Sequence, residues 1–125
     1  MRKTILICDD EPGIRESLKL ILSDFYDLIY ARNGKEAVET LKDRSQNPSL
    51  VIMDVKMPQM GGLDALPKIK RARRGIKVMI VTGYESNDVI AEATRLGADE
   101  YVVKPFEKDQ IRSLVAALIN GDPKR

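Results

Sequence analysis

Residues 50–54 read Leu-Val-Ile-Met-Asp, four apolar residues in succession followed directly by an acid. Similar apolar runs recur at 5–7, 78–81 and 101–103, and none of them alternates polar with apolar residues. Uninterrupted runs of this length are typical of strands that are buried on both faces, as in a parallel sheet. A weaker run at 28–31 fits an edge strand.

Helical patterns fill the intervals between these runs. We expect helices over about 12–24, after an Asn33–Glu36 capping pair, over about 64–73, over about 87–96 and through 111–119. Phe25 is expected on the buried face of the first helix. Pro67 is expected near the first turn of the third helix, which would then start no earlier than about Leu63. The order βαβαβαβαβα predicts a three-layer α/β domain around a parallel five-stranded sheet.

Composition narrows the possible chemistry. The chain has 125 residues, which fits one domain, and we predict that this domain occupies 1–121, with 122–125 as a frayed tail or the start of a linker. There is no histidine, so the commonest general base and zinc ligand are missing. The single cysteine, Cys8, permits no internal disulfide and is expected to be buried in its apolar strand. No apolar stretch has the length of a signal peptide or a membrane helix, which predicts a soluble, cytoplasmic protein.

Polar residues follow the predicted strands at the point where each one ends. They are Asp9, Asp10, Glu11, Asp54, Thr82 and Lys104. In open parallel sheets, ligands bind beyond the carboxyl ends of the strands, so these side chains are expected to converge. Crowded carboxylates need a compensating cation, and oxygen ligands favour Mg²⁺ or another hard metal such as Mn²⁺. A magnesium ion, an ammonium and a hydroxyl together suit phosphoryl transfer, with Asp54 as the candidate nucleophile.

Four segments together resemble the receiver domain of bacterial two-component response regulators. They are residues 8–12 (Cys-Asp-Asp-Glu-Pro), 53–62 (Met-Asp-Val-Lys-Met-Pro-Gln-Met-Gly-Gly), 81–84 (Val-Thr-Gly-Tyr) and 101–106 (Tyr-Val-Val-Lys-Pro-Phe). The resemblance spans the chain from Lys3 to about Ile119. It implies the doubly wound, flavodoxin-like (CheY-like) (βα)5 fold with strand order 2-1-3-4-5.

The resemblance also implies how the acidic residues act. Asp54 would be the residue that accepts the phosphoryl group. Asp10 would bind Mg²⁺ directly and Asp9 largely through water. Asp54 and the backbone carbonyl of Lys56 would be the remaining protein ligands of the ion.

Further roles follow for the residues around this site. Thr82 and Lys104 would contact the phosphoryl group, and Tyr101 would swing inward when Thr82 moves. The peptide bond between Lys104 and Pro105 would be cis. The glycines at 61–62 are expected to permit a positive φ in the turn before the third helix.

The implied partners are a sensor histidine kinase or a phosphotransfer protein as donor, and a downstream effector domain or target protein. A second copy could bind through the fourth helix, fifth strand and fifth helix. The protein would be a signalling switch that catalyses only its own phosphorylation and slow dephosphorylation. The basic cluster at 68–74 is expected to be a solvated helix end, with no contact to nucleic acid or membrane. Both a stand-alone receiver and the first domain of a longer regulator fit the sequence.

Three other classes of protein compete with this interpretation. One is a magnesium-dependent phosphohydrolase with an aspartyl-phosphate intermediate, although Lys56 stands where the Asp-x-Asp motif of haloacid dehalogenases has its second acid. Another is a nucleotide-binding Rossmann module, although neither of the usual glycine-rich phosphate motifs occurs. The last is a receiver-like interaction module that is never phosphorylated.

Overall fold

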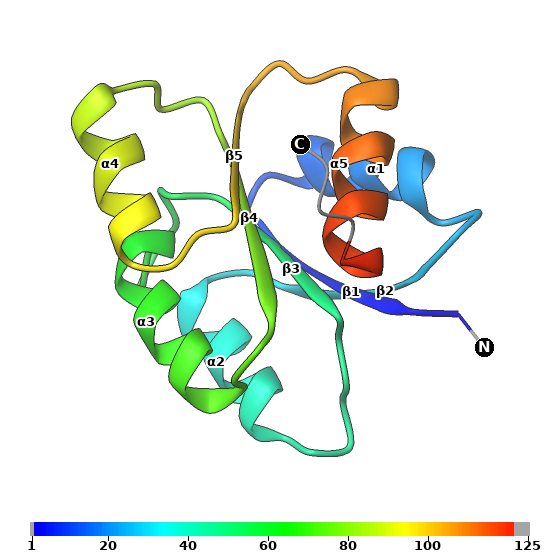
Figure 1. Cartoon of the computed structure of the whole chain (residues 1–125), viewed down its shortest axis with the longest axis horizontal. Helices are drawn as coiled ribbons and strands as arrows, with labels where there is room; N and C mark the ends of the chain where they lie inside the picture. The colour runs from blue at the N-terminus through cyan, green and yellow to red at the C-terminus, as the bar shows by residue number, and fades with distance from the viewer. Residues whose placement is uncertain (1, 122–125) are drawn as a thin grey trace.

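The computed structural model describes residues 2–121, so the predicted tail at 122–125 lies outside the described part. Strands and helices alternate in the predicted order (Figure 1). The strands are β1 Thr4–Cys8, β2 Asp27–Ala31, β3 Leu50–Met53, β4 Lys77–Thr82 and β5 Glu100–Val103. The helices are α1 Pro12–Leu22, α2 Gly34–Lys42, α3 Gly62–Ala72, α4 Asn87–Arg95 and α5 Lys108–Asn120.

The five strands form one parallel sheet in the order β2-β1-β3-β4-β5. The strand β2, predicted from the weaker apolar run, is an edge strand. The central strand β3 is buried along its whole length, which explains why its sequence does not alternate. The predicted fold class and strand order are therefore confirmed.

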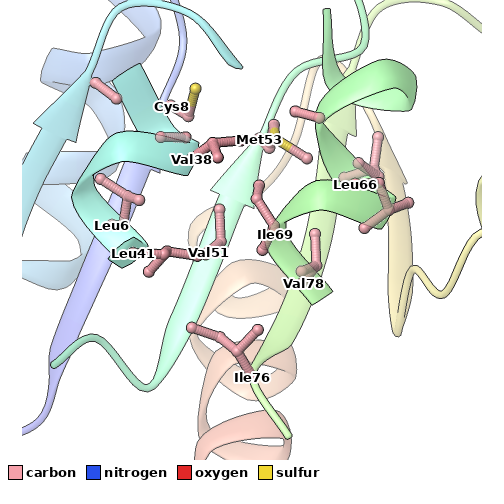
Figure 2. Close-up of a cluster of buried hydrophobic side chains, with 14 of the residues drawn as sticks. Leu6, Cys8, Val38, Leu41, Val51, Met53, Leu66, Ile69, Ile76 and Val78 are labelled. Carbon is pink, nitrogen blue, oxygen red and sulfur yellow. The ribbon is translucent and has the colours of Figure 1, made fainter. Parts of the chain in front are cut away.

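Two separate hydrophobic clusters hold the three layers together. Helices α1 and α5 cover one face of the sheet, and α2, α3 and α4 cover the other (Figure 1). Successive strand residues point to opposite faces, so Ile5 and Ile7 of β1 pack with α1 and α5, whereas Leu6 and Cys8 pack with α2 and α3. Figure 2 shows the second of these clusters between the sheet and helices α2 and α3.

The first helix is shorter than predicted and leaves Phe25 in solvent. Helix α1 ends at Leu22, and the backbone N–H groups of Phe25 and Tyr26 both donate to the carbonyl oxygen of Leu22. This turn takes Phe25 off the helical register, so the residue is 53% exposed. Its ring lies 5.0 Å from the guanidinium carbon of Arg112. The prediction that Phe25 belongs to the buried face was wrong.

Helix α3 begins at Gly62, one residue before the predicted limit, and Pro67 lies in its second turn. Proline lacks the N–H that would bond to the carbonyl of Leu63, four residues earlier. The proline therefore costs the helix this one backbone hydrogen bond, and the helix nevertheless continues to Ala72.

Gly61 and Gly62 serve close packing and do not supply a positive φ. The φ of Gly61 is −79°, and the positive φ in this loop belongs to Gln59, at 68°. A Cβ on Gly62 would lie 2.3 Å from the carbonyl oxygen of Asp54, and one on Gly61 would lie 2.5 Å from that of Val55. The expectation of a positive φ was wrong because the start of α3 is pressed directly against the backbone that follows β3.

The substitution Gly62→Ala is expected to lower the free energy of unfolding by about 2–3 kcal/mol, because the new methyl group meets a backbone oxygen that cannot rotate away. Urea denaturation followed by circular dichroism measures the change. The matched control is Gly13→Ala in α1, where a Cβ meets no atom within 4 Å and alanine favours the helix. Equal stability of Gly62→Ala and the wild type would contradict the packing argument.

Candidate functional site

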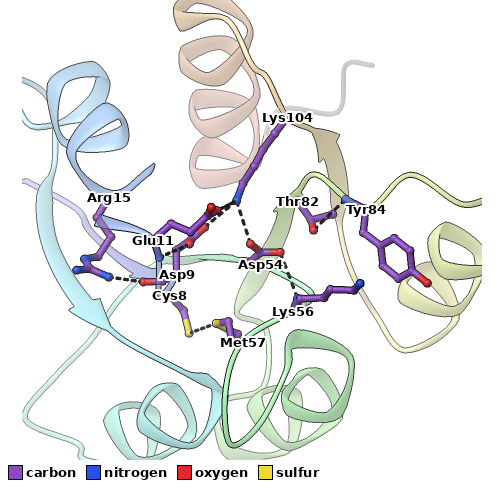
Figure 3. Close-up of polar contacts among 10 residues, drawn as sticks. All are labelled: Cys8, Asp9, Glu11, Arg15, Asp54, Lys56, Met57, Thr82, Tyr84 and Lys104. Carbon is purple, nitrogen blue, oxygen red and sulfur yellow. Dashed lines mark hydrogen bonds and ion pairs between the residues drawn. The ribbon is translucent and has the colours of Figure 1, made fainter. Parts of the chain in front are cut away.

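The carboxyl ends of four strands meet at one rim, where a pocket of about 460 Å³ opens (Figure 3). Asp9 and Asp54 directly follow the neighbouring strands β1 and β3. Thr82 is the last residue of β4, and Lys104 directly follows β5. The predicted convergence of these side chains is therefore seen in the structure. The pocket is lined by Asp10, Glu11, Asp54, Lys56, Thr82, Gly83, Tyr84 and Lys104.

The ammonium of Lys104 lies among three carboxylates. Its Nζ donates to Oε1 of Glu11 at 2.8 Å, to Oδ2 of Asp54 at 2.9 Å and to Oδ2 of Asp9 at 3.3 Å. The side chains of Asp9 and Asp54 are 4% and 8% exposed, whereas that of Glu11 is 60% exposed. The peptide bond between Lys104 and Pro105 is cis. All three N–H donors of the ammonium thus have an acceptor.

Backbone hydrogen bonds fix the two buried carboxylates. Oδ1 of Asp54 accepts from the N–H of Lys56 at 3.2 Å, and Oδ1 of Asp9 accepts from the N–H of Glu11 at 2.9 Å. Each aspartate therefore bonds to the backbone two residues further on, a turn that aspartate favours. The N–H of Asp54 also donates to the carbonyl oxygen of Cys8, so the acid is fixed to β1 as well as to its own loop.

Burial and neighbouring charges act in opposite directions at this site. Burial raises the pKa of Asp9, while the hydrogen bond from the Glu11 backbone and the positive charge of Lys104 lower it, and the net result is a raised value. Burial would lower the pKa of Lys104, but its hydrogen bonds to Glu11 and Asp54 raise it overall above the usual lysine value. One ammonium against three carboxylates leaves the site short of positive charge, which favours a further cation.

A metal ion fits this group of acids. One oxygen from each of Asp9, Glu11 and Asp54 lies within 4.8 Å of the other two, and hard cations prefer oxygen ligands of this kind. Asp10, a predicted ligand, lines the pocket but is exposed and lies outside this group. Glu11 was expected at this rim because it follows two acids at a strand end, but no catalytic or metal-binding role was predicted for it. Lys56, whose carbonyl was predicted as a ligand, lines the same pocket.

Two hydrogen bonds to the backbone of Tyr84 link the side chains of Thr82 and Tyr101. The buried Thr82 accepts a hydrogen bond at Oγ1 from the N–H of Tyr84 at 3.3 Å. The hydroxyl of Tyr101 donates to the carbonyl oxygen of Tyr84 at 2.7 Å. Nζ of Lys56 lies 4.3 Å from the centre of the Tyr84 ring, at the edge of the pocket. Tyr84, to which the sequence assigned no role, thus connects both residues of the predicted switch.

The chain belongs to the response regulator receiver domain family, whose sequence model matches residues 5–116. It is 37% identical over 116 residues to sporulation initiation phosphotransferase F of Bacillus subtilis (strain 168), covering 92% of each chain. It is 32% identical over 122 residues to chemotaxis protein CheY of Halobacterium salinarum, covering 97% of this chain and 100% of the relative.

Solved structures with a similar fold include members of the same family. A crystal structure of a CheY-like response regulator receiver domain protein from Methanospirillum hungatei JF-1 has a TM-score of 0.90 and 30% identity, covering 97% of this chain and 96% of that one. The predicted family is confirmed. The chain is a receiver domain homologous to response regulators, and its acidic pocket of Asp9, Glu11 and Asp54 fits a phosphorylation site.

The basic segment at 68–74 is partly structural. Nζ of Lys70 donates to Oδ2 of Asp99 at 2.9 Å, which ties α3 to the loop before β5. The guanidinium of Arg73 donates to the carbonyl oxygen of Leu41 at 2.8 Å, near the end of α2. Two of these cations therefore join neighbouring elements. Within residues 2–121, no helix is both long enough and apolar enough to cross a membrane.

Cys8 is buried, as predicted, and burial raises the pKa of its thiol to about 12. Only the thiolate reacts with alkylating reagents, so at pH 8 the folded protein is expected to react with iodoacetamide about a thousandfold more slowly than the urea-unfolded chain. Mass spectrometry of quenched samples measures both rates. Similar rates in the two states would contradict the burial of the thiol.

Proposed function

We propose that Asp54 accepts a phosphoryl group and that this modification switches the surface formed by α4, β5 and α5. The observation that carries the proposal is the 2.9 Å contact between Oδ2 of Asp54 and Nζ of Lys104 at the edge of the pocket. A nucleophilic oxygen and a group that stabilises negative charge are already adjacent there. A carboxylate nucleophile needs no internal general base, which suits a chain without histidine.

The proposed cofactor is Mg²⁺, with Mn²⁺ as a substitute. Asp9, Asp10, Asp54 and the backbone carbonyl of Lys56 would hold the ion. When bound, the ion would neutralise charge on the carboxylates and on the transferring phosphoryl oxygens. The shortage of positive charge around Lys104 supports this assignment. The exposed carboxylate of Asp10 has the freedom to turn into the pocket that it lines.

The proposed donor is a phosphohistidine on a sensor histidine kinase or a phosphotransfer protein. An oxygen of Asp54 would form the new P–O bond as the P–N bond breaks, and the imidazole nitrogen would leave with the electron pair. Similarity to a protein named sporulation initiation phosphotransferase F supports a place in a phosphorelay. The chain would promote only its own phosphorylation and the slow loss of that group to water, in the cytoplasm and without binding nucleic acid or membrane.

The proposed switch uses the contacts around Tyr84. Phosphorylation adds negative charge and three acceptor oxygens at Asp54. The hydroxyl of Thr82 would turn toward them and give up its bond to the Tyr84 N–H, and Tyr101 would move into the space vacated by Thr82. Helix α4 suits such a change because Ala93 is its one fully buried residue. The altered α4-β5-α5 surface would then bind a downstream effector domain, a target protein or a second copy of the chain.

The substitution Asp54→Asn is expected to abolish labelling by acetyl phosphate, because the amide is a far weaker nucleophile than the carboxylate. Wild-type protein in Mg²⁺ is expected to gain one phosphoryl group, measured by intact-protein mass spectrometry. The control Asp64→Asn changes an exposed aspartate on α3 and is expected to label like the wild type.

Stoichiometric labelling of Asp54→Asn would contradict the assignment of Asp54. Labelling of the wild type that persists undiminished in excess chelator would contradict the role of the divalent ion. Sustained turnover of a generic phosphate ester would favour a phosphohydrolase instead.

The proposed switch predicts that Thr82→Ala uncouples Tyr101 from the pocket. In wild-type protein with labelled tyrosines, the phosphoryl mimic beryllofluoride is expected to shift the ring resonances of Tyr101, measured by NMR. In Thr82→Ala the mimic is expected to bind while the Tyr101 shift falls by more than half, because the moving hydroxyl is gone. Tyr30 on β2 serves as an internal reference that should not respond. A full Tyr101 shift in Thr82→Ala would contradict the coupling.

A further inference from the structure

Glu11 is the one solvent-exposed member of the group around Lys104. Its side chain is 60% exposed, against 4% for Asp9 and 8% for Asp54. Its Oε1 nevertheless makes the shortest of the three contacts with Nζ, at 2.8 Å. An exposed carboxylate that leaves an ion pair regains its water, so releasing it costs less free energy than releasing a buried one. Of the three acids, Glu11 is therefore the one that can leave Lys104 most easily.

Phosphorylation would require one of these contacts to be released. An ammonium has three N–H donors, and in this structure each has a carboxylate as its acceptor. A phosphoryl group on Asp54 would bring three further acceptor oxygens next to Lys104. The carboxylate of Asp9 is buried and cannot reach water by turning away from Lys104, and Asp54 carries the new group. The carboxylate of Glu11 is exposed and can turn into water, so its contact is the one most easily exchanged.

We propose that Glu11 is a displaceable partner, which holds Lys104 in the unphosphorylated protein and is released when the phosphoryl group arrives. This inference rests on the proposed phosphorylation of Asp54. Glu11 acts through Lys104, so it is a positioning residue. Because its carboxylate must give up Lys104 and also repels an incoming anionic donor, Glu11 keeps the site biased toward the unphosphorylated state.

The electrostatics of Lys104 agree with this exchange. Two carboxylates, those of Asp9 and Asp54, remain within 3.3 Å of Nζ of Lys104 if Glu11 leaves. When Glu11 leaves, the phosphoryl oxygens supply the missing negative charge. Lys104 thus stays charged before and after the exchange, and only its partner changes.

The test measures the affinity for beryllofluoride at saturating Mg²⁺, by titration of NMR resonances, together with the initial rate of labelling by acetyl phosphate. Glu11→Gln keeps the size of the side chain and removes its charge. We expect the variant to bind beryllofluoride about fivefold more tightly and to label about fivefold faster, the scale of one exposed ion pair. Affinity or rate at or below the wild-type value would overturn the inference.

Two matched variants separate the contact from the charge. Glu11→Asp keeps the charge but is one methylene too short to keep the 2.8 Å contact, so it is expected to recover at least half of the gain. Glu16→Gln removes the same charge from an exposed position on α1 and is expected to match the wild type. The inference would be overturned if Glu16→Gln gained as much affinity and labelling rate as Glu11→Gln, or if Glu11→Asp gained none. Either result would mean that the net charge of the protein, and not the contact with Lys104, causes the effect.

The metal dependence completes the test. A tenfold loss of Mg²⁺ affinity in Glu11→Gln would identify Glu11 as a metal ligand and would also overturn the inference. Failure of the wild type itself to label or to bind beryllofluoride would remove the proposed function of Asp54, and this inference with it. A wild type that labels normally beside an unaltered Glu11→Gln would remove the inference alone.

Discussion

The ion pairs between Lys104 and the two buried aspartates, Asp9 and Asp54, are the interaction on which the site depends. They join the end of β5 to the ends of β1 and β3, across the strand β4 that lies between. Taking away one partner of a buried ion pair is destabilising by roughly 3–5 kcal/mol, because the remaining charge loses its compensation. Two acids can therefore sit side by side at this rim only because a lysine from a distant part of the chain lies between them.

The sheet makes this arrangement rigid. Both of its faces are covered, so the ends of β1 and β3 are set by packing that does not involve the polar rim. The start of α3 presses on the backbone of Asp54 through Gly62, which fixes the acid from the other side. What remains adjustable lies at the edge of the pocket, in Glu11, Lys56 and Tyr84, whose side chains reach solvent.

Much of this structure could be predicted from the sequence because its main signals are local. Buried parallel strands have uninterrupted apolar runs, and a polar residue directly after each run marks the rim. The predictions were wrong where contacts between distant parts of the chain determine the local conformation. Phe25 leaves the helical register through a turn at Leu22. The glycines at the start of α3 are required by the nearby carbonyl oxygens of Asp54 and Val55, which no sequence pattern reveals. Glu11 and Lys104 lie 93 residues apart along the chain and were expected at the same rim, but that Glu11 is a partner of the ammonium depends on side-chain geometry.

The division of the core into two clusters has a consequence for the face formed by α4, β5 and α5. Helix α4 belongs to one cluster and α5 to the other, and β5 contributes Tyr101 to the first and Val102 to the second. This face therefore crosses the edge of the sheet at β5, with one cluster on each side of it. A displacement of α4 would disturb the packing of one cluster and a displacement of α5 the packing of the other, so the two helices that border this face do not share a core.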